Sequence, residues 1–413
     1  MRGAKLLPKL LPTNRTVLGL QSFEGFLARF SDGELLLSYC CVRLRRSLDF
    51  GVTFQAPEEH PELPQTKLEW AVHITNNDTV LMSNSNGGLF RSVDRAQTFH
   101  LVSIPATVPT LPEGHENKCV PRTVAEGVGN HSFGCTGWTI IEVQKDDPHL
   151  AGGLYHFGDA YTYHSATDGQ SWSVFSAAHG HTARTGGVYK DEFFAQSGVF
   201  RRADGTFLHS TRWNTAYCDE WAGGQLWQST DTKAEHWQCR TQAAGGICNP
   251  GSTLNCFRPA DPYGAQCTNA SNPLFLKPGN HFSHFLRLRD GRLLMTWTHR
   301  SNVIDDDDFG TGSRALLSDD ELTFDFDSDY IVISAAESDD YCCLSGDTPW
   351  CCAPAKGGCN CFAGYGNTVQ LPDGVLVTAT FRVLVNGSSF ADDHQYQTVI
   401  TRWQLPPRAK VAE

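Results

Sequence analysis

Short apolar runs recur along the chain, and several of them pair across an Asp-Gly step. Four segments share this form: FLARFSDGELLLSY (26–39), GVFRRADGTFLHSTRW (198–213), HFLRLRDGRLLMTWTHR (284–300) and NTVQLPDGVLVTATFR (367–382). ITNNDTVLMS (74–83) is a looser copy. Because Asp-Gly between β-rich runs is typical of tight hairpin turns, each segment predicts two antiparallel strands.

A second pattern, Ser-x-Asp-x-Gly-x-Thr followed by an aromatic residue, recurs between these hairpins. SLDFGVTF (47–54) has the complete form, SVDRAQTF (92–99) has alanine for the glycine, and SATDGQSW (165–172) has the aspartate shifted by one. Looser copies run over 229–237 and 318–324. The aspartate can accept backbone N–H bonds, the glycine can adopt a positive φ angle, and the closing aromatic is expected to fill the space between neighbouring sheets.

The alternation of the two patterns predicts the architecture. Two hairpins make a four-stranded antiparallel blade, and blades arranged radially make a β-propeller. We therefore expect an all-β fold, a single six-bladed β-propeller domain over 1–413, with short flexible termini at about 1–14 and 406–413. The last apolar run, QYQTVITRWQL (395–405), is expected to close the ring with N-terminal strands.

Composition and charge narrow the classes of function. The formal net charge of the 413 residues is −12, which argues against a generic binder of nucleic acid or of anionic membranes. The sequence has no apolar run long enough for a transmembrane helix. It also lacks nucleotide-binding and zinc-protease motifs, so neither a cofactor nor a metal ion is expected.

The cysteines and glycosylation motifs favour an oxidising compartment. Six of the 15 cysteines lie in YCCLSGDTPWCCAPAKGGCNC (341–361), whose spacing fits a disulfide-stapled loop better than a zinc site. Five N-x-S/T motifs begin at Asn14, Asn77, Asn130, Asn269 and Asn386. The chain is therefore expected to be secreted or to reside in the secretory-pathway lumen, although a signal peptide is not evident in the sequence.

With these motifs, the chain resembles the sialidase superfamily. The repeated Ser-Asp pattern is similar to the Asp-box of that family, and LRRSLDFGVTF (44–54) is similar to its first box with the preceding strand. The resemblance implies a sialidase-type propeller that hydrolyses a terminal acidic sugar. In such enzymes a tyrosine nucleophile, helped by a glutamate, attacks the sugar, an aspartate is the acid/base, and three arginines hold the carboxylate.

Individual residues carry the resemblance. GYGNTVQLPDG (364–374) resembles the strand of the tyrosine nucleophile, which makes Tyr365 the expected nucleophile. QSGVFRRADGTFLHSTR (196–212) resembles the strand pair that bears the glutamate and an arginine. Arg212 matches the arginine, whereas Gln196 stands at the glutamate position and cannot act as a base. The place of the first family arginine falls on Phe23 or Glu24.

Position along the predicted blades adds further candidates. The predicted ends of second strands carry Arg300 and Arg382, as well as Arg212 and Arg43, and these arginines are candidates for binding an acidic sugar. His281 is a further candidate at the channel. Glu69 and Asp219 are the candidate acids for the leaving oxygen.

Three functions remain open at this point. The first is a sialidase-like exo-glycosidase with a carbohydrate substrate. The second is a non-catalytic glycan-binding propeller, favoured by Gln196 and by the missing first arginine. The third is a polysaccharide lyase acting on uronic acids, in which arginine neutralises the carboxylate while His281 or Tyr365 removes the α-proton.

Overall fold

The computed structural model describes 15 stretches of the chain, and everything below concerns these residues. They are 9–20, 25–39, 43–64, 70–84, 88–102, 136–158, 161–177, 198–212, 224–239, 280–299, 312–324, 330–334, 363–364, 366–384 and 395–406.

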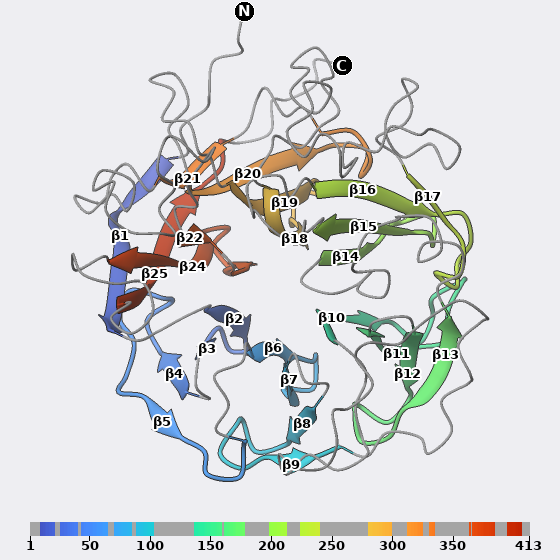
Figure 1. Cartoon of the computed structure of the whole chain (residues 1–413), viewed down its shortest axis with the longest axis horizontal. Helices are drawn as coiled ribbons and strands as arrows, with labels where there is room; N and C mark the ends of the chain where they lie inside the picture. The colour runs from blue at the N-terminus through green and yellow to red at the C-terminus, as the bar shows by residue number, and fades with distance from the viewer. Residues whose placement is uncertain are drawn as a thin grey trace, which may run out of the picture.

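The described residues form six antiparallel sheets arranged radially around a central opening (Figure 1). The innermost strands contact one another in the order β2, β6, β10, β14, β18, β23 and again β2, which closes the ring. The fold is therefore the six-bladed β-propeller predicted from the sequence.

Each of the first three blades has four strands, numbered outward from the channel. Blade 1 consists of β2 (Phe26–Arg29), β3 (Leu35–Tyr39), β4 (Arg43–Ser47) and β5 (Glu58–Glu59). Blade 2 consists of β6 (Trp70–Ile74), β7 (Val80–Asn84), β8 (Leu89–Ser92) and β9 (His100–Leu101). Blade 3 consists of β10 (Thr136–Val143), β11 (Gly153–Gly158), β12 (Tyr161–Ser165) and β13 (Ser173–Ala177).

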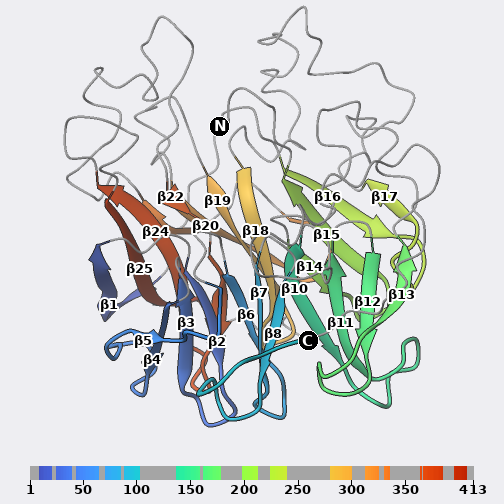
Figure 2. The same ribbon diagram turned by 60° about the horizontal axis from the view of Figure 1, so that its bottom comes forward.

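Blades 4 and 5 repeat this order. Blade 4 consists of β14 (Gly198–Arg201), β15 (Phe207–Arg212), β16 (Gly224–Ser229) and β17 (Trp237–Cys239). Blade 5 consists of β18 (Asn280–Arg287), β19 (Leu293–His299), β20 (Gly312–Ser318) and β21 (Tyr330–Ser334). Figure 2 shows blades 3 to 5 from the side, with their strands running along the depth of the ring.

Blade 6 joins the two ends of the chain. Its innermost position is divided between β22 (Ala363–Gly364) and β23 (Thr368–Gln370), and both pair with β24 (Leu376–Leu384). Beyond β24 come β25 (Gln395–Gln404) and then β1 (Lys9–Leu20), which pairs with β25 from Lys9↔Gln404 to Leu20↔Gln397. The predicted closure of the ring by residues 395–405 and an N-terminal strand is confirmed.

The five hairpins predicted from the apolar runs are confirmed as the first and second strands of blades 1, 2, 4, 5 and 6. The corresponding hairpin of blade 3, β10–β11, was missed, because residues 144–152 between its strands contain no Asp-Gly step. No helix in the described part of the chain has the length and hydropathy needed to cross a membrane.

The five Ser-Asp segments all form the turn between the third and fourth strands of blades 1 to 5. In the turn at 47–54 the Asp49 carboxylate accepts hydrogen bonds from the Thr53 amide (2.8 Å) and hydroxyl (2.6 Å), while the Gly51 amide donates to Ser47 Oγ (2.7 Å).

In the turn at 165–172 the shift of the aspartate by one residue changes which side chain holds the turn. Thr167 takes the place of the aspartate and accepts from the Ser171 amide (2.9 Å), so Asp168 is available to blade 2.

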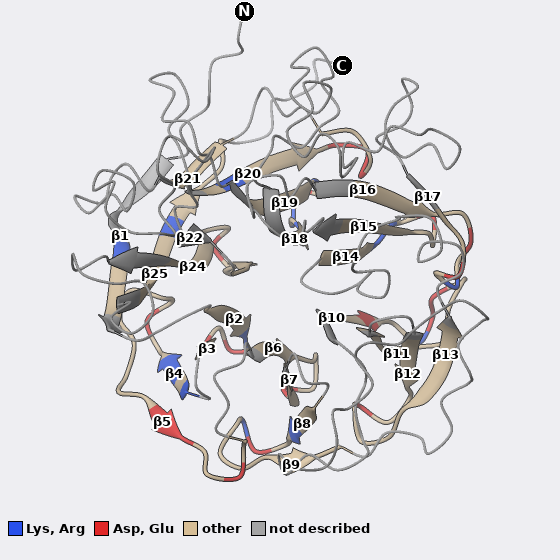
Figure 3. Cartoon of the chain, in the orientation of Figure 1, with Lys and Arg blue, Asp and Glu red and all other residues tan. Residues whose placement is uncertain are grey.

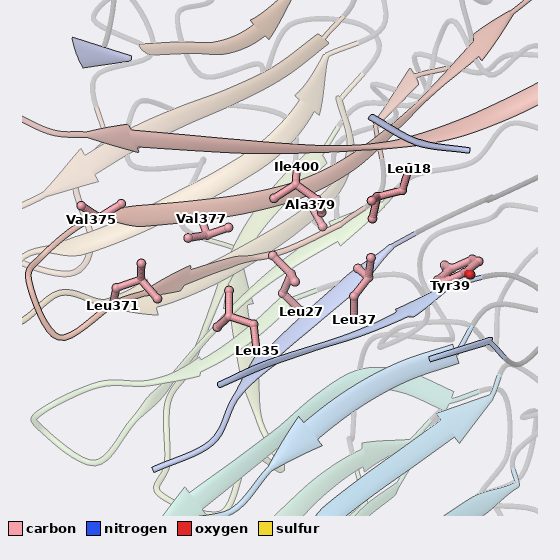
Figure 4. Close-up of a cluster of buried hydrophobic side chains, with 10 residues drawn as sticks. All are labelled: Leu18, Leu27, Leu35, Leu37, Tyr39, Leu371, Val375, Val377, Ala379 and Ile400. Atoms are coloured by element: carbon pink, nitrogen blue, oxygen red, sulfur yellow. The ribbon is translucent and has the colours of Figure 1, made fainter. Parts of the chain in front are cut away.

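The core lies between blades rather than in one central cluster. Figure 4 shows the cluster that joins the last blade to the first, in which Leu27, Leu35 and Leu37 of blade 1 face Val377 and Ala379 of blade 6. All five side chains are buried. Because second strands are covered on both faces, they are nearly continuous apolar runs, as in β3, where every residue is buried.

Polar contacts at the hairpin turns fix the rotation of one blade against the next. The backbone N–H at the start of the turn is capped by a side chain of the following blade in four places. These are Ser31 by Asp78 (2.8 Å), Asn76 by Glu142 (2.8 Å), Ala203 by Glu321 (3.0 Å) and Arg289 by Gln370 (2.9 Å). The corresponding residue of blade 6 is Pro372, which has no N–H to cap.

Charged side chains reinforce these junctions. Figure 3 shows basic residues on β4 beside acidic residues on β5. There Arg46 forms ion pairs with Glu58 (2.8 Å) and Glu34 (2.7 Å) within blade 1. Arg95 of blade 2 extends the network to Glu34 (2.6 Å) and Asp32 (2.9 Å).

Candidate functional site

The innermost strands enclose a cavity of about 310 Å³ in the central channel. Its lining comes from β2, β6, β10, β18 and the start of β23. Each of these strands is the edge of its sheet, so the backbone groups that the blade leaves unused face the channel. The cavity is therefore walled by backbone polar groups as well as by side chains.

Two uncharged imidazoles belong to this lining. Burial lowers the pKa of His284 to about 4. Burial lowers the pKa of His73 to about 4 as well, and the Asp168 carboxylate opposes this shift only in part. Within the described part of the chain, His284 Nδ1 and His73 Nε2 have no hydrogen-bond partner. At neutral pH neither residue contributes a charge to the channel.

An amide clasp joins blade 6 to blade 1 at the wall of the cavity. Asn367 Oδ1 accepts a hydrogen bond from the Leu27 amide, and Asn367 Nδ2 donates to the Leu27 carbonyl, both at 2.6 Å. Thr139 makes a similar contact from blade 3 to blade 4, where its Oγ1 accepts from the Val199 amide (3.2 Å). A side chain early in the innermost strand therefore satisfies an edge amide of the next blade.

The strand of the expected nucleophile is interrupted at the residue after Tyr365. Gly366 has φ +153°, and a Cβ atom there would lie 1.9 Å from the Ala379 carbonyl oxygen. Only glycine fits such a close backbone approach. The Ala379 amide instead donates to the Asn367 carbonyl (3.0 Å), which restores the ladder beyond the break. Irregular strands of this kind are frequent beside functional sites.

Three predicted site residues have a described backbone, and their side chains lie outside the described part. Arg212 is the last residue of β15 and pairs with Gly224. Arg382 lies near the end of β24 and pairs with Ala363. His281 is the second residue of β18 and pairs with Thr298. Because an innermost strand starts where its antiparallel partner ends, all three positions lie at the same end of the ring.

Five predicted site residues, Tyr365, Gln196, Glu69, Asp219 and Arg300, lie outside the described residues. In the sequence they lie beside or between described strands. Glu69 directly precedes β6, Gln196 comes two residues before β14, and Arg300 directly follows β19. Tyr365 stands between Gly364 and Gly366, and Asp219 stands between β15 and β16.

One arginine differs from its expected place. Arg43 was predicted at the end of a second strand, but it is the first residue of β4, the third strand, because β3 ends at Tyr39. The pair Cys40-Cys41 and Val42 form the connection and lie outside the described residues. Arg43 is still at the end of the ring where innermost strands start.

The sequence interpretation missed three residues that line the cavity, namely Asn367, Thr139 and Arg29. Asn367 and Thr139 are polar residues early in innermost strands, a signal that is visible only once the blades are aligned. Arg29, which also lines the cavity, lies at the other end of β2, next to the hairpin turn.

No protein-family model matches the sequence, and no curated protein matches it. The structure is similar to that of a protein of unknown function from Dyadobacter fermentans, with 14% identity and a TM-score of 0.55 over 96% of this chain and 100% of that chain. This similarity concerns the fold alone.

Two further solved structures are more distant. One is an α-L-arabinanase from Penicillium chrysogenum complexed with arabinobiose, with 10% identity and a TM-score of 0.43 over 94% of this chain and 98% of that chain. The other is YCF48 bound to a D1 peptide, with 11% identity and a TM-score of 0.42 over 98% of this chain and 100% of that chain. At these scores neither structure bears on the function of this chain.

Proposed function

We propose that the protein is a carbohydrate-active propeller, and more narrowly a sialidase-like exo-glycosidase that hydrolyses a terminal acidic sugar. The support for this proposal is the position of the candidate residues along the strands of the ring. The backbone positions of Arg212, Arg382 and His281 share the end of the ring at which innermost strands start. Tyr365 and Glu69 adjoin residues at that same end.

The proposed reaction assigns each residue a role. Arg212, Arg300 and Arg382 hold the sugar carboxylate, since the planar guanidinium donates two parallel hydrogen bonds to it. The Tyr365 oxygen attacks the anomeric carbon while the bond to the leaving oxygen breaks. Glu69 or Asp219 gives a proton to the leaving oxygen, and the other carboxylate accepts the phenol proton in place of Gln196. Water then cleaves the tyrosyl-sugar bond and releases the product.

The test is hydrolysis of a fluorogenic sialic-acid glycoside by the wild type and by Tyr365→Phe. We expect the variant to lose at least about a thousandfold in kcat/KM, because no covalent intermediate can form without the hydroxyl. Tyr330→Phe is the matched control, since Tyr330 lies on the outermost strand of blade 5 and its substitution should leave turnover unchanged. Equal turnover by Tyr365→Phe and the wild type would exclude the tyrosine mechanism.

Glycan binding without turnover is the second candidate, and Gln196 is the observation that favours it. Glutamine cannot accept the phenol proton, and a propeller can retain sugar recognition after losing its base. If the wild type hydrolyses nothing, this function predicts that immobilised acidic glycans bind the wild type and bind Arg212→Gln at least about tenfold more weakly. A uronate polymer is the third substrate to assay, because release of an unsaturated product from it would indicate the lyase reaction of His281 and Tyr365.

A further inference from the structure

Arg29 stands out at the central cavity, at the end opposite to the backbone positions of Arg212, Arg382 and His281. It is the last residue of the innermost strand β2, and it lines the cavity together with residues of four other blades. Among the lining residues in the described part of the chain, Arg29 is the one with a formal charge. No carboxylate of the described residues forms an ion pair with it, and it makes no side-chain hydrogen bond to them.

Two other arginines occupy the same position and serve as internal comparisons. Arg29, Arg201 and Arg287 each precede the residue whose amide closes the hairpin turn, and each is followed by the same Arg-x-x-Asp-Gly spacing. Arg201 is paired with Asp147 of the preceding blade at 2.6 Å. Arg287 is paired with Glu321 of its own blade and also lies over the Phe200 ring, 4.9 Å from its centroid. These two guanidinium groups are neutralised within the protein, whereas no carboxylate among the described residues neutralises Arg29.

The neighbouring blade explains why Arg29 has no carboxylate partner among the described residues. The blade before β2 is blade 6, whose hairpin turn contains Pro372 and Asp373. The Asp373 side chain is exposed, and its Oδ1 accepts a hydrogen bond from the Val375 amide (3.0 Å) within the turn. This junction therefore has no counterpart of the Arg201–Asp147 pair.

We propose that the central cavity binds one small oxyanion, a carboxylate or a phosphate, through Arg29. The guanidinium fork matches two oxygens of such an anion, and the described residues of the lining include no carboxylate that would repel it. A volume of about 310 Å³ admits a small ligand and excludes a polymer. The bound anion neutralises Arg29 at the junction where the first and last blades meet, and it thereby stabilises the closed ring.

This site does not rest on the proposed glycosidase function, because it uses different residues at the other end of the channel. The experiment is calorimetric titration of the wild type with inorganic phosphate and, separately, with acetate, in a zwitterionic buffer. Thermal unfolding is followed in parallel. We expect saturable binding of one anion per chain and a rise in melting temperature for at least one of the two probes. Binding of phosphate alone or of acetate alone identifies which oxyanion class the cavity takes.

Variants separate this site from other cationic sites. Arg29→Gln is expected to weaken binding roughly tenfold or more, because it removes a charge-assisted hydrogen-bonding group. Arg29→Lys should retain part of the affinity, since it keeps the charge without the fork. Arg201→Gln should lower the melting temperature and still bind the anion. Absence of saturable binding to the folded wild type, or equal binding by Arg29→Gln, would overturn the proposal.

Discussion

At the scale of single residues, each Ser-Asp turn is held by hydrogen bonds among its own side chains and amides. In the turn at 92–99 the Asp94 carboxylate accepts hydrogen bonds from the Ser92 hydroxyl (2.6 Å), the Gln97 amide (3.1 Å), and the Thr98 amide (2.9 Å) and hydroxyl (2.6 Å). Partial burial by itself would raise the pKa of Asp94, but these bonds outweigh it and hold the pKa well below its usual range. The turn also holds Ala96 at φ +64°, where the turns at 47–54 and 165–172 have Gly51 and Gly169.

The turn can be tested with one pair of substitutions. Asp94→Ala should lower the free energy of unfolding by about 2 kcal/mol, because several amide and hydroxyl donors lose their acceptor. Val93→Ala is the control, since Val93 is the adjacent residue and its side chain is 64% exposed. Urea denaturation of both variants gives the comparison. Equal losses for the two variants would show that the carboxylate does not hold the turn.

At the scale of strands and blades, short contacts between residues far apart in the sequence decide the geometry. Asn367 and Leu27 are 340 residues apart, yet two hydrogen bonds join them across the junction of blades 6 and 1. The hairpins themselves were predictable, since each is encoded by adjacent apolar runs and a turn. Their mutual caps, such as Glu142 on the Asn76 amide, were not, because nothing in one hairpin specifies which residue of another will face it.

The clasp between blades 6 and 1 provides a test at this scale. Asn367→Ala should lower the free energy of unfolding by about 3 kcal/mol, because the Leu27 N–H and C=O are left without partners in a buried place. The control is Asn76→Ala, whose side chain is exposed and whose contact with Glu142 uses only its backbone amide. Chemical denaturation monitored by tryptophan fluorescence measures both variants. If the two variants are equally stable, the clasp does not contribute to ring closure.

At the scale of the whole molecule, buried histidines in blades 2, 3 and 5 make the stability of the fold depend on pH. Burial lowers the pKa of His73, His156 and His284 to about 4 from an ordinary value of 6.5. His156 is fully buried in β11, and its ring lies edge-on to Trp172 with the centroids 6.0 Å apart. Since the unfolded chain takes up these protons first, the stability conferred by the neutral imidazoles is complete above pH 6.5 and declines as the pH falls toward 4.

This dependence can be measured residue by residue. Each histidine should account for about 3 kcal/mol of lost stability on full acidification. His156→Leu should therefore reduce the slope of the free energy of unfolding against pH between pH 6.5 and 4. The reduction corresponds to the uptake of up to about one proton fewer on unfolding, and it is expected even if the variant is less stable at pH 7. His100→Leu is the control because His100 is exposed on β9. An unchanged slope for His156→Leu would contradict the assignment.

A second loss of stability is expected at lower pH. The pKa values of Asp49, Asp94 and Asp320 are lowered, since hydrogen bonds to these carboxylates outweigh the opposing effect of burial. Groups with a lowered pKa stabilise the fold above their unfolded pKa of about 3.8, and this contribution is lost as the pH falls through the folded value. The acid transition should therefore occur in two stages, first through the histidines and then through the Ser-Asp turns.

The sequence by itself determined the strands, the hairpin turns, the Ser-Asp turns and their assembly into six blades, because these depend on residues close together in the chain. It also supplied the candidate site residues, such as Tyr365 and Arg212, through motifs whose residues lie at fixed spacing. Only the tertiary structure decided which side chains meet across blades and what the channel contains. Arg29, Arg201 and Arg287 share one local motif, yet two of them are neutralised and one faces the cavity without a carboxylate partner among the described residues. The reason is that a partner on another strand is fixed by the rotation of one blade against the next, which no local pattern records.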